Sequence, residues 1–339
     1  MTRLILTLTI ALSGCSLKPT PSAITPPSSL YDSPLLDASS QQPLTQAQLV
    51  EQLADDDVVI IGEYHGHQAA HLLQARLQQA LYQQRPNQVL TMEQFTVADQ
   101  AALDRYLQDA IGETELIEDA NAWANYRASY RPLVEFAKQH QRPVIATNAP
   151  QPIVRCLARH GLAYLAGLPE AQRERLTVLP LVGSEAYRQR FIEAIGGSHG
   201  DDNHQAGNRQ DAYHAARLQN SYTAQLLRDN TMATQIAKAL DRHPGAQVLH
   251  LTGAFHSDYH QGTVAALRAL HPELAITVIS PVFWPVEDDQ RPVRASPAQG
   301  DILYFILPLP KEYRDPERQR QALRQQFDHP TATCDTAAL

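Results

Sequence analysis

Two stretches of the sequence place histidine shortly after a run of apolar residues. Residues 58–61 are followed by Glu63 and His65, and residues 248–252 are followed by His256. Both stretches end in the pattern Gly-x-x-His. The first run consists of Val and Ile, which crowd poorly in helices and pack well in sheets, so it predicts a buried strand. The second run leads into the same Gly-x-x-His ending and predicts a second strand. Ionisable side chains at the carboxyl ends of such strands are the usual way in which an open α/β sheet builds a site.

Two further predicted strands end in polar residues, Glu93 and Asn148. Two imidazoles and two carboxylates that meet at one sheet edge could act as acid and base, with Glu63, His65, Glu93 and His256 in the catalytic roles. They could also hold a divalent metal, with the two histidines as candidate ligands. Any one of these residues could instead cap the helix that follows it. The set as a whole favours a functional site.

Another pair of histidines, His67 and His71, is spaced i, i+4. This spacing places both rings on one helix face and resembles half of a zinc site. The glutamate that follows the first histidine in the zinc-protease motif is absent. We therefore interpret His71 as a residue of a helix face rather than as a ligand.

The alternation of predicted strands and helices indicates an α/β fold, with a mostly parallel sheet flanked by helices. Strands are expected at residues 58–61, 88–92, 143–147, 248–252, 275–280 and 301–307. The last of these is expected at an edge or antiparallel, because a Pro-rich segment precedes it. Helices are expected at residues 45–53, 68–84, 98–108, 121–140, 209–241 and 263–270.

Helical patterns follow one another from about residue 151 to 243, which predicts a large helical subdomain inserted between strands. Its Gly-rich loop contains His199 and His204, and Tyr213 and Tyr222 follow on the next helix. Phenolate and imidazole are both axial ligands of haem iron, so these four residues, together with His214, His260 and Tyr259, could ligate iron or haem. A hydrophilic loop that contains histidine without a ligand role is the other interpretation.

Arg228 lies within the long predicted helix of this insertion. Its guanidinium could hold an anionic group of a ligand through two parallel hydrogen bonds. A solvated helix face is the alternative. The two interpretations differ in where the side chain points, which the sequence does not give.

Composition and missing motifs exclude several classes of function. The chain has 339 residues with a net charge of −8, which gives no reason to expect nucleic acid as a partner. It has no Gly-x-Ser-x-Gly, no P-loop and no Gly-x-Gly-x-x-Gly after a predicted strand. Serine hydrolases, nucleotide-binding proteins of the P-loop type and Rossmann enzymes therefore lack support.

The first residues are typical of a targeting segment. Arg3 precedes an apolar run at residues 4–12, which is too short to span a bilayer. Leu-Ser-Gly-Cys then resembles the bacterial lipoprotein signal, which implies cleavage before Cys15 and lipidation of its thiol. An ordinary secretory signal is the alternative. Ser16, rather than Asp, after this cysteine suggests anchoring to the periplasmic leaflet of the outer membrane.

The expected organisation follows from these segments. A signal peptide at residues 1–14 precedes the lipidated cysteine and a flexible tether, at residues 15–43, whose Pro, Ser and Thr content suits a linker. An α/β domain at residues 44–310 contains the helical insertion at residues 151–243, and a peripheral helix and tail occupy residues 311–339.

Two cysteines besides Cys15 occur, Cys156 and Cys334. A periplasmic location permits a disulfide between them. The sequence does not give the distance that separates them, so the pairing stays open. Neither has a Cys or His neighbour at zinc-finger spacing, which makes both poor candidates for metal ligands.

Several short motifs occur in an order that resembles the ChaN-like family of the haem-binding uptake, Tiki superfamily. They are Gly62-Glu63-Tyr64-His65, Met92-Glu93-Gln94-Phe95, Asn148-Ala149-Pro150, Tyr222-Thr223-Ala224-Gln225 with Arg228-Asp229 and Met232-Ala233, and Gly253-Ala254-Phe255-His256. The resemblance covers the chain from about residue 44 to 307. The lipoprotein signal agrees with it.

The resemblance implies an α/β core with a helical subdomain, in an iron-regulated lipoprotein that binds haem during uptake. It also implies a homodimer that holds two haems face to face, with Tyr as iron ligand and His from the partner chain assisting. Candidate ligands here are Tyr213, Tyr222, His199 and His204, and Arg228 is a further cofactor-binding candidate. The wider superfamily includes metal-dependent proteases and esterase-like enzymes, so a hydrolase that uses the strand-end Glu and His residues is the alternative function.

Overall fold

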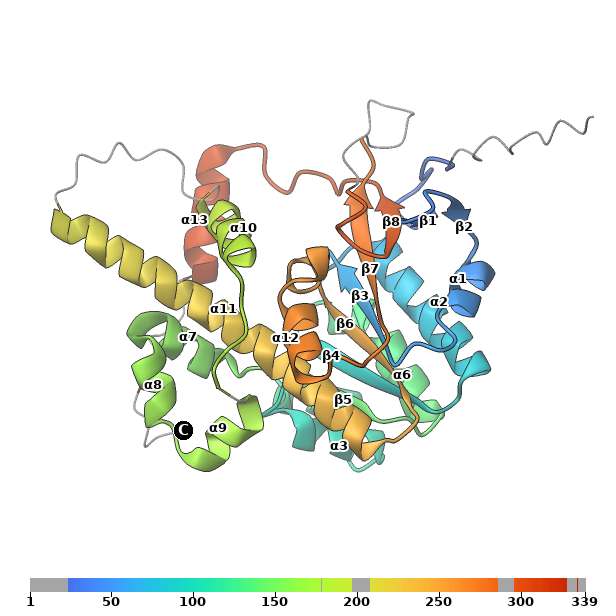
Figure 1. The fold of residues 1–339 in the computed structure, drawn as a ribbon, viewed down its shortest axis with the longest axis horizontal. Coiled ribbons are helices and arrows are strands. Elements are labelled where there is room, and N and C mark those ends of the chain that lie inside the picture. The colour runs from blue at the N-terminus through green and yellow to red at the C-terminus, as the bar shows by residue number, and fades with distance from the viewer. Residues whose placement is uncertain (1–23, 178, 197–207, 286–295, 328–333, 335–339) are drawn as a thin grey trace, which may run out of the picture.

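A single eight-stranded sheet forms the centre of the computed structural model, which describes residues 24–177, 179–196, 208–285, 296–327 and 334. The strands are β1 (Leu35–Asp37), β2 (Pro43–Leu44), β3 (Val58–Glu63), β4 (Gln88–Thr96), β5 (Val144–Asn148), β6 (Gln247–Gly253), β7 (Ile276–Phe283) and β8 (Ile302–Ile306). Their order across the sheet is β2-β1-β8-β7-β3-β6-β4-β5 (Figure 1). All neighbours from β8 to β5 pair in parallel, and β1 pairs antiparallel with β8 and β2. The predicted mostly parallel sheet is confirmed.

Helices cover both faces of this sheet. They are α1 (Gln46–Gln52), α2 (Gln68–Gln84), α3 (Gln100–Leu107), α4 (Glu113–Asp119), α5 (Tyr126–Ser129), α6 (Arg131–Gln139), α7 (Gln151–His160), α8 (Leu162–Gly167), α9 (Glu170–Leu176), α10 (Glu185–Gly196), α11 (Asn208–Arg242), α12 (Thr263–Leu270) and α13 (Pro316–Phe327). Two short 3-10 turns, η1 (Ala254–His256) and η2 (Asp258–His260), follow β6. The helices predicted at residues 68–84 and 263–270 match α2 and α12.

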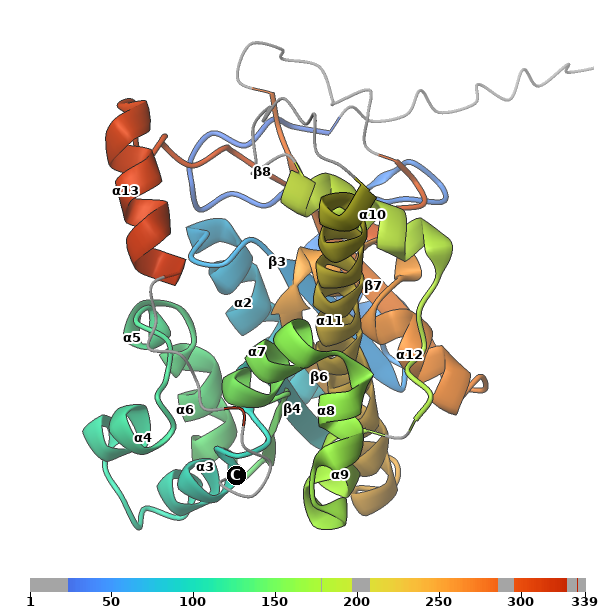
Figure 2. The ribbon, with the colours of Figure 1, turned by 90° about the vertical axis from the view of Figure 1, so that its left-hand side faces the viewer.

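Strand β3 shows how the sheet separates two cores. Val59 and Ile61 pack in a cluster with residues of α2 and α6, whereas Val58 and Ile60 pack with residues of α11 and α12. Successive side chains of a strand point to opposite faces, so an unbroken apolar run fits a strand that is covered on both sides. Figure 2 shows α11 and α12 on one side of the strands and α2 on the other.

The prediction of an edge or antiparallel strand at residues 301–307 is wrong. β8 lies inside the sheet because β1 pairs with its other side, and it runs parallel to β7. Of the flexible tether predicted at residues 15–43, the structure describes residues 24–43, and the prediction is wrong where β1 (Leu35–Asp37) and the first residue of β2 join the sheet. Leu36 is buried there against Trp284 and Phe305, and this apolar contact fixes a segment whose composition suggested a linker.

The prediction of a single helix at residues 121–140 is also wrong. The structure has α5 and α6 there instead, after a break at Asn121, whose φ of 43° is left-handed and incompatible with a continuing helix. Pro132 falls in the first turn of α6, where a proline starts a helix rather than extending one. The breaks allow Tyr126 and Tyr130 to turn into the core.

The described chain between β5 and β6 is helical, as predicted for residues 151–243. α7, α8 and α9 share an apolar cluster with one face of α11, and Tyr187 and Phe191 of α10 pack on another part of that helix. A disulfide joins Cys156 of α7 to Cys334 in the tail, across 178 positions of sequence. The pairing that the sequence left open is thus made, and it links Cys334 to α7.

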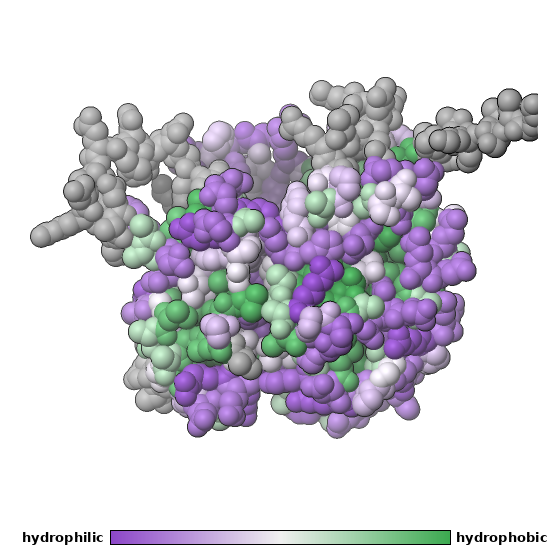
Figure 3. Space-filling view, in the orientation of Figure 1, coloured by the Kyte–Doolittle hydropathy of each residue, from purple (hydrophilic) through white to green (hydrophobic). Residues whose placement is uncertain are grey.

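The surface is mixed in character. Figure 3 shows apolar residues gathered among polar ones over the helical region at α7 and α8, where Leu162 is exposed. Within the described ranges, none of the helices is both long and apolar enough to span a membrane.

Candidate functional site

The carboxyl ends of β3, β6 and β4 bring the predicted strand-end residues together. β3 and β6 are neighbours in register, with Glu63 opposite Gly253. Glu63 is buried and accepts hydrogen bonds from His65 Nδ1 at 2.8 Å, Tyr130 Oη at 2.6 Å and Gln74 Nε2 at 2.5 Å. A carboxylate with this many donors stays in place as an acceptor, so it fixes the orientation of the histidine ring.

His65 is the accessible member of this group. Its side chain is 43% exposed, while the side chain of Glu63 is fully buried. Trp123 packs edge-on against the imidazole, with ring centroids 4.8 Å apart. Burial disfavours the imidazolium, but the hydrogen bond to Glu63 and the charge of Glu93 outweigh it and raise the pKa of His65. The result is an oriented imidazole with Nε2 directed away from its carboxylate partner.

His256 occupies a different environment, between two carboxylates. Its Nδ1 lies 2.7 Å from Asp229 Oδ1, and its Nε2 lies 3.4 Å from Glu93 Oε1. Burial opposes protonation, but the charges of Glu93 and Asp229 outweigh it and raise the pKa of His256 to about 10. The same imidazolium overcomes the burial of Glu93 and lowers the pKa of that carboxyl well below its usual range. His256 is therefore a fixed cation at neutral pH, not a base.

Asp229 was not predicted as a site residue. It is fully buried on α11 and accepts hydrogen bonds from Tyr187 Oη at 2.8 Å and Thr263 Oγ1 at 3.1 Å, in addition to His256. Its only sequence signal is its place next to Arg228 in one of the motifs that carry the resemblance. An aspartate in the middle of a polar helix stretch otherwise looks like a solvated residue.

Both glycines of the Gly-x-x-His motifs are required by close approach. A Cβ on Gly253 would lie 3.0 Å from Nε2 of His65, and a Cβ on Gly62 would lie 2.8 Å from Oγ of Ser257. Side chains here would displace the imidazole or the turn after β6. The glycine of each motif is therefore explained by the close packing of the ends of β3 and β6.

The i, i+4 histidines serve the structure of the site rather than a metal. His67 is buried and caps α2 by accepting from the backbone N–H of Ala69, and its Nε2 pairs with the carbonyl oxygen of Leu307. His71 is buried too, contrary to a simple surface position, with its ring against Gln74 and the N–H of Gly66. Over the described ranges, no group of three or more His, Cys, Asp or Glu residues is arranged to hold a metal ion.

Arg228 and Asn148 meet at the same sheet edge, where α7 begins. Arg228 Nη1 donates to Asn148 Oδ1 at 3.3 Å, and Nη2 donates to Gln151 Oε1. The guanidinium thus points across to β5 and α7, and is half-buried rather than on a solvated helix face. It lies close enough to Glu93 and Asp229 for their charges to act on its pKa.

The four predicted haem ligands lie apart from this edge or outside the described residues. Tyr222 is buried between Tyr187 and Phe191, and its hydroxyl donates to the carbonyl oxygen of Ser184 at 2.9 Å. Tyr213 belongs to the first turns of α11, and its side chain is outside the described residues. His199, His204 and the lipidation residue Cys15 also lie outside them.

Aromatic side chains outside the predicted catalytic residues also border the strand ends. Tyr64 stacks on Phe283 at 4.3 Å between ring centroids, and each is 39% exposed. Tyr259, 41% exposed, has a left-handed φ of 62°, and Arg190 lies over its ring at 5.1 Å. Such a rim around polar groups is typical of ligand sites.

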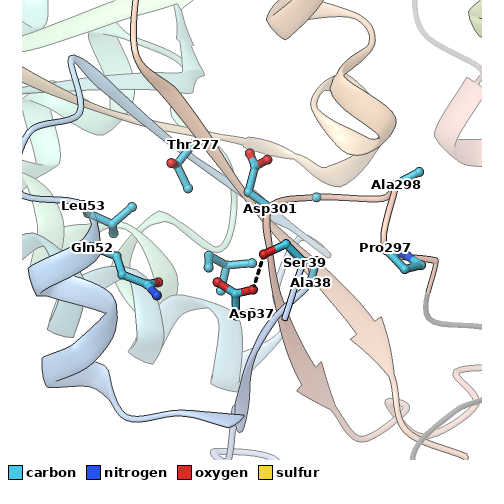
Figure 4. Close-up of a pocket in the computed structure, with 11 residues that line it drawn as sticks. Asp37, Ala38, Ser39, Gln52, Leu53, Thr277, Pro297, Ala298 and Asp301 are labelled. Atoms are coloured by element: carbon cyan, nitrogen blue, oxygen red, sulfur yellow. Dashed lines mark hydrogen bonds between the residues drawn. The ribbon is translucent and has the colours of Figure 1, made fainter. Parts of the chain in front are cut away.

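A separate pocket lies at the opposite edge, at the amino ends of β7 and β8. Figure 4 shows Thr277 and Asp301 on one side of it and Asp37, Gln52 and Leu53 on others. Ser39, which also lines it, donates to Asp37 at 2.7 Å. None of the predicted site residues lines it, so it is distinct from the strand-end site.

Comparison with solved structures identifies the fold. The haem-binding ChaN of Campylobacter jejuni, described as binding haem cofacially, has a TM-score of 0.60 and 16% identity, covering 82% of this chain and 98% of that chain. A Bacillus cereus structural-genomics target has a TM-score of 0.46 and 11% identity, covering 84% and 95%. A mutant of the erythromycin esterase EreC in its open conformation has a TM-score of 0.42 and 14% identity, covering 87% and 86%.

Comparison of the sequence gives the family. No curated protein matches the chain. The family described as "Haem-binding uptake, Tiki superfamily, ChaN" matches residues 49–267, which contain the strand-end acids and histidines, α7 to α11 and most of α12. The Gly-x-x-His ends of β3 and β6, the acid of β4 and the Arg-Asp pair of α11 all fall within this range and all meet at one sheet edge. The chain belongs to the haem-binding uptake, Tiki superfamily, ChaN family.

Proposed function

We propose that the chain binds haem, and that it does so as a lipoprotein anchored to the periplasmic leaflet of the outer membrane and engaged in haem or iron uptake. The observation that carries the proposal is the family match over residues 49–267. The lipoprotein-like sequence that ends at Cys15 supports the anchor. The disulfide between Cys156 and Cys334 supports an oxidising compartment, because disulfides persist there and are rare in the cytosol.

The start of α11 offers a suitable place for haem. Ferric haem needs a phenolate or imidazole that the iron can reach. The side chains of residues 214–217, which directly follow Tyr213, are exposed, and this end of α11 projects beyond the sheet in Figure 1. Tyr222, further along the same helix, would have to leave an aromatic cluster and a hydrogen bond to reach iron. We therefore favour Tyr213 as the iron ligand over Tyr222, with His199 and His204 as assisting candidates.

A titration of the purified protein with ferric haem tests the proposal. Wild type is expected to shift the Soret band and give a high-spin spectrum typical of tyrosinate ligation. Tyr213→Phe should lose this spectrum and Tyr222→Phe should retain it. A spectrum that stays that of free haem at micromolar wild-type protein would refute haem binding. Loss in Tyr222→Phe alone would move the ligand to the buried tyrosine.

The proposal extends to assembly. A homodimer could place the exposed residues 214–217 of two α11 helices together, with one haem on each chain, as the word cofacial describes for the Campylobacter jejuni protein. Sedimentation with and without haem measures this. Haem should raise the dimer fraction of wild type and leave that of Tyr213→Phe unchanged.

Hydrolysis is a second candidate function, and one observation favours it. His65 combines an accessible side chain with a buried carboxylate that orients it, which is the arrangement of a general base. Glu63 would hold the ring, His65 would take a proton from water or a substrate hydroxyl, and the fixed cation His256 would keep Glu93 ionised. Turnover of an activated ester that His65→Gln abolishes would support this function.

A further inference from the structure

The segment before β1 is fixed to the domain from Ile24 onward. Ile24 packs against a cluster that contains Leu36 of β1 and Phe305 of β8. The carbonyl oxygen of Pro34 accepts a hydrogen bond from the backbone N–H of Phe305 at 2.9 Å. Ile24 therefore marks where the chain that leads from Cys15 joins the folded domain.

The lipid anchor that we propose at Cys15 can lie only a short distance from this point. Nine positions of sequence separate Ile24 from Cys15. A chain of that length spans at most about 30 Å, whatever its conformation, because a fully extended residue covers roughly 3.3–3.6 Å. A bilayer that holds the anchor therefore lies within about 30 Å of Ile24, and the end of the domain that contains Ile24 is the end that can approach it most easily.

The same end of the domain exposes four large apolar side chains. Tyr31 and Leu309 are 61% and 40% exposed, and Tyr64 and Phe283 form the exposed stacked pair described above. We call these four residues the anchor-side surface. Single exposed apolar side chains need no explanation, whereas several that gather in one place mark a surface that contacts a partner or a membrane.

The sheet places these residues beside Ile24. Phe283 is the last residue of β7, which pairs with β8, and Tyr64 stacks on its ring. Leu307 follows β8 and packs against the same cluster as Ile24, two positions before Leu309. The segment before β1 and the chain that leaves β7 and β8 lie at the upper end of the molecule in both Figure 1 and Figure 2.

The charges beside Leu309 balance one another. Lys311 and Arg314 supply two cations, and Glu312 and Asp315 supply two anions. Such a segment gains little from anionic headgroups, so contact with a bilayer would depend on the apolar side chains. Tyrosine suits this role, because its ring is apolar while its hydroxyl stays in water at a membrane interface.

A tether makes a few apolar contacts sufficient. On a free protein, four such side chains hold a bilayer only weakly, since membrane affinity grows with the apolar area that is buried. An anchor at Cys15 keeps the anchor-side surface within reach of the membrane, which raises the effective concentration of one for the other. A partner protein in solution has no such advantage, so the bilayer is the favoured occupant.

We propose that the anchor-side surface contacts the phospholipid bilayer and thereby sets the orientation of the domain on the membrane. The inference rests on the proposed lipid anchor at Cys15. It turns the ends of β7 and β8 toward the bilayer and α8 away from it. The start of α11 projects sideways from the sheet in Figure 1, so this orientation leaves the proposed haem position uncovered.

Quenching by nitroxide-labelled lipid tests the orientation. The purified lipidated protein is incorporated into vesicles of phosphatidylethanolamine and phosphatidylglycerol, with bimane attached to Leu309→Cys or to the matched control Leu162→Cys, an exposed leucine of α8. Cys156 and Cys334 are joined to each other and do not take the label. Nitroxide on the lipid headgroup should quench bimane at position 309 severalfold more than at position 162.

Removal of apolar side chains from the surface should release the orientation. Tyr31→Ser combined with Phe283→Ser should bring the quenching at position 309 toward the level at position 162. Both side chains are exposed, so the fold should persist, and the melting temperature checks this. Leu270→Ser, which removes an exposed leucine at the end of α12, is the control and should leave the quenching unchanged.

The mass of the purified chain and its sedimentation with the vesicles test the anchor separately. A chain that carries no lipid overturns the anchor and, with it, this inference. A lipidated chain that sediments with the vesicles, but is quenched as strongly at position 162 as at position 309, overturns this inference and leaves the anchor in place. The same conclusion follows if Tyr31→Ser with Phe283→Ser does not change the quenching at position 309.

Discussion

His256 Nδ1 lies 2.7 Å from Oδ1 of Asp229, although the two residues lie on different elements, 27 positions apart in the sequence. With Glu93 on the other side of the ring, the imidazolium links the ends of β4 and β6 to the middle of α11. The helical region and the sheet therefore share a buried ionic contact. This contact distinguishes the two Gly-x-x-His motifs, because His65 is left accessible and His256 is not.

The first prediction concerns Asp229→Asn. Removing this charge leaves His256 with one carboxylate in a fully buried position, which should lower its pKa and destabilise the fold by about 3 kcal/mol. Denaturant unfolding at pH 7 measures the loss. Asp241→Asn, at the exposed end of the same helix, is the control and should change stability by less than about 0.5 kcal/mol. Equal effects of the two substitutions would contradict a special role of Asp229.

The second prediction is a pH dependence of stability. The pKa of His256 is raised to about 10 in the folded protein, whereas an unfolded histidine titrates near about 6.5. The stabilisation is therefore complete below about pH 6.5 and is lost as the pH rises to about 10. The free energy of unfolding should fall over this window by up to about 1.4 kcal/mol per pH unit.

His256→Gln identifies the source of this slope. Urea unfolding at pH 6.5, 8 and 9.5 should give a smaller decline for the variant than for wild type. Glu93 contributes on the acid side, since its lowered pKa gives stability that is present above the usual glutamate range and is lost as the pH falls. Parallel curves for wild type and His256→Gln above pH 7 would show that another group causes the decline.

The strand ends could be predicted from sequence because their signals are local. A run of Val and Ile before Gly, Glu and His predicts β3, and its repeat predicts β6 and the shared site. Parallel neighbours then place Glu63, His65, Glu93 and His256 at one edge without further information. The existence of the site follows from these patterns, but the different roles of the two histidines do not.

What could not be predicted depends on contacts between distant segments. Asp229 looks like a polar helix residue until the packing of α11 on β6 buries it. The sequence around β1 has the composition of a linker, and only the packing of Leu36 against Trp284 and Phe305 makes it part of the fold. The partner of Cys156 is 178 positions away in a polar tail, and no local pattern reports that distance. In each case a partner far along the chain decides the structure.

The third prediction concerns the disulfide. Cys334→Ser removes the covalent link to α7 and increases the number of conformations that the unfolded chain can adopt. The free energy of unfolding should therefore fall by about 2–4 kcal/mol. Unfolding with and without a reducing agent measures this, and reduction should affect wild type but not the variant. Wild type that is insensitive to reductant would show that the bridge does not form in the purified protein.

The last prediction concerns His65 as a general base. Burial opposes its protonation, but Glu63 and Glu93 outweigh burial and raise its pKa, so only the form that exists above this pKa can accept a proton. If the site hydrolyses an activated ester such as p-nitrophenyl acetate, the rate should rise with pH to a plateau that begins above the usual histidine range. His65→Gln should lower the rate by about 100-fold or more.

Glu63→Gln should shift the pH–rate profile to lower pH, because the carboxylate that raises the pKa of His65 is lost. His160→Gln, exposed on α7, should leave rate and profile unchanged. Turnover that survives in His65→Gln would place any hydrolysis elsewhere, and haem binding at α11 would be unaffected by that result.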